Sequence, residues 1–280
     1  MIDVIIVTAS AWDDRRKPGL DRLLAQIPTR GPFVLSSPKP EPSTVWARRA
    51  WEFVVKRDRP CAILNDDIDV CPDFPLVVDA MIEAVPDQIL SLHAQAADVA
   101  RLASEGHRWA RAYQLTGPAY VLHPHHARAL LDFWAEWPEL QHAKNVNEDN
   151  VASQWAFCNQ RPMWLAIPAV VQHDVSVPST LGYDHHLYRQ SSVPWTESGA
   201  DLLDWSHESE PPWIENPWFK VDDMARRKRA REALRSAQRE GLCMWCAERA
   251  PLAGSPMTGV VLCASCLGNV AQTVIGRMQP

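Results

Sequence analysis

Short apolar runs in the N-terminal part of the chain alternate with stretches whose apolar residues are three or four positions apart. Residues 3–8 (DVIIVT) form a continuous β-branched run, which is typical of a buried parallel strand. Residues 20–27 follow with the apolar spacing of a helix, and the alternation continues along the chain. This pattern predicts an α/β fold in which helices flank a sheet.

The same patterns predict the remaining elements of this part. Strands are expected at residues 32–35, 62–64, 88–92, 113–122 and 166–173. Helices are expected at residues 43–54, 73–85 and 125–134 and from residue 148 onward. Gly117 and Pro118 interrupt the run at 113–122, where a glycine either lets the backbone approach a ligand closely or forms a plain turn.

Composition is that of an ordinary globular protein, with 280 residues, 46% hydrophobic and 22% charged, and a net charge of −6. The length allows one large core with an appendage, or two domains. We read the N-terminus as a strand and not as a signal peptide, and no apolar run approaches the roughly 18 residues of a membrane span. Three scattered cysteines (Cys61, Cys71 and Cys158) suit a reducing cytoplasm better than a disulfide framework.

Residues 61–70 (CAILNDDIDV) are the most suggestive stretch of this part. A short apolar strand ends in Asn65, Asp66 and Asp67, and Asp69 follows. Open α/β sheets bind ligands at the carboxyl ends of their strands, and Mg²⁺ or Mn²⁺ on a phosphate prefers oxygen ligands there. The alternative is that these acids cap loops and helices.

Two further groups have a functional and a structural interpretation. The polar loop after the first strand, with Ser10, Arg15 and Arg16, could hold a base, ribose and pyrophosphate, or it is a solvated turn. Glu148 and Asp149 stand at the first turn of a predicted helix, where they favour the helix dipole or supply a general base.

A histidine closes the last predicted strand of this part. His173 is either a polar boundary residue or a metal ligand. Beyond it, residues 191–221 are rich in Trp and Pro, which predicts a structured arm wrapped over the preceding domain.

Residues 222–241 read as a charged helix, with seven basic residues and one acid between 226 and 239. Such a helix could contact phosphates or present a solvated face. The residues that we expect to contact nucleic acid are Arg226, Arg227, Lys228 and Arg229.

The most specific motif lies in residues 242–280. Two Cys-x-x-Cys pairs are separated by sixteen residues, which matches a tetrahedral Zn²⁺ site. We predict a structural zinc ribbon held by Cys243, Cys246, Cys263 and Cys266.

In order and spacing, the elements of residues 1–185 resemble the A-type (GT-A) glycosyltransferase fold, the Rossmann-like transferases that use nucleotide sugars. The segment PAVVQHDVSVPSTLG, which contains His173, is similar to a stretch of bacterial and phage members. The motif reads Asn-Asp-Asp where many members have acid-x-Asp, so Asp67 is the safest ligand. The fold class implied is a mixed GT-A sheet over residues 1–190.

The resemblance also implies roles for individual residues. Mn²⁺ or Mg²⁺ would bind Asp67, Asp69 and His173, and the base would be Asp149 or Glu148. Donor contacts would fall at Thr8, Ser10, Arg15, Arg16, Asp66 and Gly117.

The function expected is metal-dependent transfer of a hexosyl or pentosyl group from a nucleotide sugar, most readily a UDP-sugar, to a hydroxyl. The basic helix and zinc ribbon make the chain similar to phage enzymes that glycosylate hydroxymethylated pyrimidines in DNA, which implies a DNA acceptor and a host cytoplasm. Alternatives are a protein or surface-glycan acceptor, and a nucleic-acid-binding scaffold with an inactive transferase domain.

Overall fold

The computed structural model describes residues 2–27, 31–95, 97–115, 117–136, 148–177, 191–195, 203–206, 208–214, 232, 252–255 and 260–263. The chain divides into two compact units, Met1–Trp218 and Phe219–Pro280. Among the described residues, no helix combines the length and the apolar character that a membrane crossing requires.

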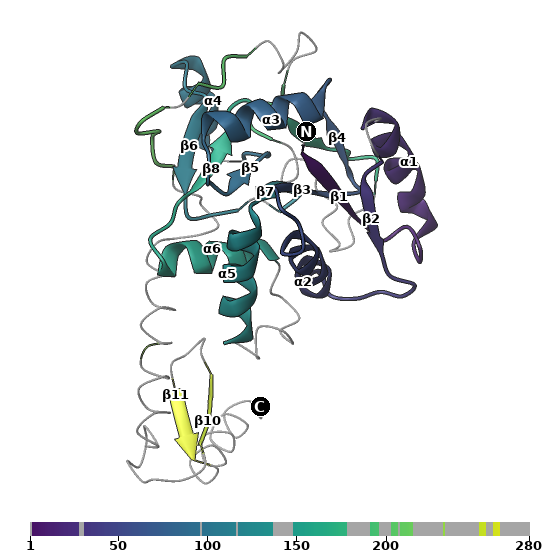
Figure 1. The fold of residues 1–280 in the computed structure, drawn as a ribbon, viewed down its shortest axis with the longest axis vertical. Coiled ribbons are helices and arrows are strands. Elements are labelled where there is room, and N and C mark those ends of the chain that lie inside the picture. Colours follow the sequence, from purple (N-terminus) through teal and green to yellow (C-terminus); the bar gives the residue numbers. More distant parts are fainter. Residues whose placement is uncertain are drawn as a thin grey trace, which may run out of the picture. The chain divides into compact units, whose positions relative to one another are not determined.

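A seven-stranded mixed sheet forms the centre of the first unit, with the strand order β2-β1-β3-β7-β5-β8-β6 (Figure 1). Its strands are β1 (Asp3–Thr8), β2 (Phe33–Ser36), β3 (Cys61–Asn65), β5 (Leu90–Ser91), β6 (Trp109–Ala112), β7 (Ala119–Leu122) and β8 (Met163–Ala166). β1 is parallel to both β2 and β3, and β5 is parallel to β8. β7 runs antiparallel between β3 and β5, and β6 is antiparallel to β8.

This topology brings several chain segments to one edge of the sheet. The carboxyl ends of β1, β3, β5 and β8 point the same way, and β7 begins there because it runs in the opposite direction. The Asn65 amide donates to the Pro118 carbonyl across this junction (2.9 Å). We call this side of the sheet the carboxyl edge, and the side where β3 begins and β7 ends the opposite edge.

Helices cover both faces of the sheet, with α3 on one side and α2, α5 and α6 on the other (Figure 1). In β1, Val4 and Ile6 belong to the core with α1 and α3, whereas Ile5 belongs to the core with α2, α5 and α6. The period-two alternation of the strand therefore feeds two separate cores. The helices are α1 (Lys17–Gln26), α2 (Ser43–Val54), α3 (Phe74–Ala84), α4 (Ala97–Ser104), α5 (Pro124–Ala135) and α6 (Glu148–Cys158), with a short 3₁₀ helix at Asp14–Arg16. The predicted α/β fold with a mixed, helix-flanked sheet is confirmed.

One predicted strand is divided. Residues 166–173 do not form a single strand, because Pro168 follows β8 and cannot donate a backbone hydrogen bond to the ladder. The chain then enters β9 (Val171–His173), which leaves the main sheet and pairs antiparallel with β4 (Ile68–Val70). This second ladder, which the sequence patterns did not predict, places Ile68 opposite His173.

Described parts of the Trp-rich segment pack on the first unit. Trp205 is buried, and its ring lies 5.4 Å from that of Trp109. The Arg111 amide donates to the Pro212 carbonyl (2.8 Å), and the Ile214 amide donates to the Arg111 carbonyl (2.9 Å). These contacts form an isolated parallel bridge between Arg111 and Trp213 beside β6.

In the second unit, the structure describes an antiparallel pair, β10 (Leu252–Ser255) and β11 (Val260–Cys263). Cys263 is the last residue of β11. The other three predicted zinc ligands lie outside the described residues, as does the predicted basic helix apart from Glu232.

Candidate active site

Asp66 is the most strongly held acid at the carboxyl edge. Its carboxylate accepts hydrogen bonds from the Thr8 hydroxyl (2.6 Å) and the Ala9 amide (3.1 Å) at the end of β1. The Arg16 guanidinium donates to the other carboxylate oxygen through Nε (2.9 Å) and also through Nη2. Asp66 and Arg16 are both almost fully buried. This pairing fastens the loop after β1 to the end of β3, so Asp66, Thr8 and Arg16 position the edge.

A glycine lets α1 approach the same place. A Cβ at Gly19 would lie 2.7 Å from the Asp66 carbonyl oxygen and 2.8 Å from a Val177 methyl group. Both distances are too short for a Cβ to fit unless the Asp66 backbone and the Val177 side chain move away. The close approach of α1 holds Arg16 over the carboxylates.

Asp67 and His173 meet at the same edge. The β4–β9 ladder brings the imidazole Nδ1 of His173 within 3.8 Å of the Asp67 carboxylate and 3.3 Å of its carbonyl oxygen. The Asp174 amide donates to that carbonyl (2.8 Å). Arg16 Nη2 lies 3.5 Å from the same Asp67 carboxylate oxygen. Both side chains are mostly buried but reach the surface, with exposed fractions of 9% and 14%.

Asp69 has partners of a different kind. Its carboxylate accepts hydrogen bonds from Arg22 Nε (2.7 Å) and Gln26 Nε2 (3.2 Å), both on α1. Arg22 also forms an ion pair with Asp174, just beyond β9. Arg22 therefore ties α1 to both strands of the β4–β9 ladder, and Asp69 serves as an anchor of that ladder.

Two carboxyls at the start of α6 face the beginning of β7. A Cβ at Gly117 would lie 3.5 Å from an Asp149 carboxylate oxygen and 3.8 Å from one of Glu148. Burial raises the pKa of Glu148 to about 7, with a further contribution from the charges of Asp149 and Asp67, against a hydrogen bond from Ser43 that lowers it. Burial likewise raises the pKa of Asp149 to about 6. The pair is thus tuned to exchange protons near neutral pH.

Other predicted donor contacts are less closely joined to the edge. The Ser10 amide donates to the Thr8 hydroxyl (3.0 Å), which holds the loop but leaves the role of the Ser10 side chain undefined. Arg15 is 72% exposed and pairs with Asp13 (2.8 Å), so it points away from Asp66, unlike its neighbour Arg16.

His93 belongs to this site and was missed by the sequence patterns. It follows β5 at the carboxyl edge, is almost fully buried, and its ring lies 5.5 Å from that of His173 in an edge-to-face arrangement. Its signal was present in the sequence, since His93 follows a predicted strand just as His173 ends one.

No family model and no curated protein sequence matches this chain. The functional assignment therefore depends on the geometry of the carboxyl edge.

The donor set at this edge suits a divalent cation bound together with a phosphate. Arg16 and Thr8 hold Asp66, and residues of α1 hold Asp69, whereas the Asp67 carboxylate faces both the His173 imidazole (3.8 Å) and Arg16 (3.5 Å). Mg²⁺ and Mn²⁺ bind phosphorylated substrates with one or two protein ligands and complete their coordination with phosphate oxygens and water. The residues fit such an ion.

Proposed function

We propose that the first unit is a metal-dependent glycosyltransferase that uses a nucleoside-diphosphate sugar. The observation that carries this proposal is the convergence of Asp67, His173 and the Glu148–Asp149 pair at one edge of an α/β sheet. A metal ion can stabilise the departing diphosphate, and a carboxylate can take the proton of the attacking hydroxyl if the transfer inverts the sugar.

The acid pair would carry the proton transfer. Burial raises the pKa of both carboxyls, so one carboxylate of the pair, which we assign as Asp149, can accept the proton of an acceptor hydroxyl near neutral pH. Glu148 beside it keeps the proton to a higher pH. Gly117 lets the backbone before β7 lie close to the Asp149 carboxylate, since a Cβ there would already be in contact with it at 3.5 Å.

Asp67 and His173 would hold Mn²⁺ or Mg²⁺ against the diphosphate. When bound, the ion supplies Lewis-acid stabilisation of the charge that develops on the departing nucleoside diphosphate. Arg16 lies 3.5 Å from Asp67 and adds a fixed positive charge beside the same carboxylate. Asp66 orients Arg16, and Thr8 orients Asp66.

A donor screen tests this function. The purified full chain is incubated with individual nucleotide sugars and Mn²⁺, and release of the nucleoside diphosphate is followed by mass spectrometry. We expect turnover of one donor, with a UDP-sugar the first choice, and its loss on chelation of the metal. Absence of turnover with every donor, in the presence of hydroxylated acceptors, would favour a binding scaffold in place of an enzyme.

We propose DNA with hydroxymethylated pyrimidines as the acceptor. The support is the sequence of the second unit, where basic residues 226–229 precede the four paired cysteines of a zinc ribbon. A gel-shift assay should show salt-sensitive DNA binding that is lost when residues 222–280 are deleted. Unchanged binding and transfer after that deletion would favour a protein or surface-glycan acceptor.

A further inference from the structure

A second cluster of ligating side chains lies at the opposite edge of the sheet. His125 and His126 belong to the first turn of α5, which follows the end of β7, and Asp87 belongs to the loop before β5. Each of the three offers one ligand atom, and these atoms all lie within 4.8 Å of one another. The His125 Nε2 atom is 2.7 Å from an Asp87 carboxylate oxygen, and the rings of His125 and His126 are 4.1 Å apart.

His126 gives an independent reason to expect a ligand. It is 3% exposed, and its Nδ1 atom has no hydrogen-bond partner. A buried polar atom without a partner is costly, and native structures rarely leave one unsatisfied. A metal ion at Nδ1 would satisfy it.

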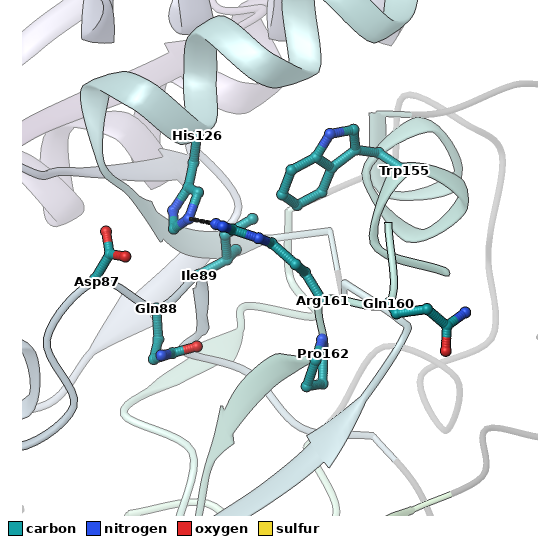
Figure 2. A pocket seen from close by; sticks show the side chains of 8 residues that line it. All are labelled: Asp87, Gln88, Ile89, His126, Trp155, Gln160, Arg161 and Pro162. Carbon is teal, nitrogen blue, oxygen red and sulfur yellow. Dashed lines mark hydrogen bonds between the residues drawn. The ribbon is translucent and has the colours of Figure 1, made fainter. Parts of the chain in front are cut away.

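A pocket of about 260 Å³ opens beside His126 and includes Asp87 in its lining. Figure 2 shows Asp87 and Arg161 on opposite sides of the His126 ring, with Trp155 nearby. The pocket has room for the water molecules that complete the coordination of an ion held by three protein ligands.

We propose that Asp87, His125 and His126 form a second metal site, which takes a borderline divalent transition ion such as Zn²⁺ or Ni²⁺. Two imidazoles and a carboxylate bind such ions in preference to Mg²⁺ or Ca²⁺, which favour oxygen ligands alone. The site lies at the edge of the sheet away from Asp67, so its occupant is distinct from the ion proposed to serve transfer.

The Arg161 guanidinium and the N-terminus of α5 both disfavour a cation at this site, and they provide a way to distinguish a cation site from an anion site. The Arg161 Nη1 atom lies 3.5 Å from His126 Nε2, and the N-terminus of α5 is the positive end of its dipole. Asp87 is the carboxylate that offsets them. Because Arg161 places a positive charge 3.5 Å from His126 Nε2, removal of that charge should strengthen cation binding. An anion site would respond in the opposite way.

Calorimetric titration of the full chain with Ni²⁺, in excess Mg²⁺, tests the site. Stoichiometry is compared between variants that all retain the four paired cysteines, because the zinc ribbon predicted there would also take up Ni²⁺. We expect His125→Ala and Asp87→Asn to remove one class of site or weaken it at least about tenfold. Arg161→Gln should tighten it. His107→Ala is the matched control, because His107 also contacts carboxylates but belongs to no three-ligand group among the described residues.

Imidazole signals provide a second readout that does not depend on stoichiometry. In the [¹⁵N]histidine-labelled chain, paramagnetic Ni²⁺ should broaden the signals of His125 and His126 before that of His107. Equal Ni²⁺ binding in the wild type, His125→Ala and Asp87→Asn would overturn the proposal. Binding of inorganic phosphate that is lost in Arg161→Gln, with no Ni²⁺ effect on His125, would also overturn it and identify an anion site.

Discussion

The imidazole of His173 lies 3.8 Å from the carboxylate of Asp67, although 106 positions separate the two residues in the chain. The contact depends on the antiparallel ladder between β4 and β9, in which Ile68 is opposite His173. It brings an oxygen donor and a nitrogen donor, both predicted from the sequence to bind Mn²⁺ or Mg²⁺, to the carboxyl edge of the sheet.

Breaking the buried ion pair behind this site should destabilise the fold. Arg16→Met would leave the Asp66 carboxylate buried without its cation, and we expect a loss of about 3–5 kcal/mol in the free energy of unfolding. Urea denaturation measures it. Arg15→Met is the matched control, because Arg15 is 72% exposed and its removal should change stability by less than about 0.5 kcal/mol. Equal stability of the two variants would contradict a structural role for Arg16.

Gly19→Ala tests the close approach of α1. Replacing glycine with alanine inside a helix usually stabilises it by up to about 1 kcal/mol. Here the new Cβ would stand 2.7 Å from the Asp66 carbonyl oxygen, so we expect a net loss of about 1–3 kcal/mol in the free energy of unfolding.

Gly117→Ala is the control for that substitution. Its Cβ would meet Asp149 at an ordinary contact distance of 3.5 Å, and stability should change by less than about 0.5 kcal/mol. Stabilisation by Gly19→Ala would show that α1 does not contact the end of β3 in this way.

The pKa values of the acid pair predict a pH profile for transfer. A general base must be ionised, and the raised pKa values of Glu148 and Asp149 mean that the rate should fall as pH decreases through about 7 to 6. In Glu148→Gln we expect a single ionisation at about 6, from Asp149, to remain in the pH dependence of kcat. Asp149→Asn should remove the ionisation at about 6 from the pH dependence of whatever rate remains. A rate that is flat from pH 8 to 5 would exclude the pair as the base.

The same pair should affect stability in the opposite direction: the free energy of unfolding should increase as pH falls, whereas the transfer rate should decrease. The pKa of Glu148 is about 7 in the folded protein and near 4.5 as its ordinary value, so the folded state binds the proton more tightly than the unfolded state. The contribution of Glu148 therefore becomes more favourable as pH falls from 7 toward 4.5. Glu148→Gln should raise stability at pH 8 by on the order of 2 kcal/mol in thermal or urea denaturation. No gain would mean that the carboxyl is not desolvated.

The sequence patterns predicted β1, β2, β3, β5 and β7 and much of the acidic edge for identifiable reasons, but they did not predict β6 or β8. The run at β1 and the run before Asp66 are short, continuous and apolar, which is how buried parallel strands read. The Glu148–Asp149 pair was placed at a helix start by the apolar residues that follow it. Such local signals do not depend on distant contacts.

What could not be predicted depends on partners far away in the chain. No local pattern distinguishes Asp66, bound by Arg16, from Asp69, bound by Arg22, because the choice is made by the position of α1. The β4–β9 ladder has three residues in each strand, which is too short for periodicity to detect. The Asp87–His125–His126 cluster requires knowing that β5 begins where β7 ends.

Metal-dependent release of nucleoside diphosphate in an Asp67 variant tests the central claim most directly. The rate is measured against Mn²⁺ concentration for the wild type, Asp67→Ala and the control Asp58→Ala, which removes an acid that is 83% exposed and outside the carboxyl edge. We predict that Asp67→Ala lowers the rate at least about a hundredfold at saturating Mn²⁺ and that Asp58→Ala leaves it unchanged. Full activity of Asp67→Ala without added metal would contradict the account.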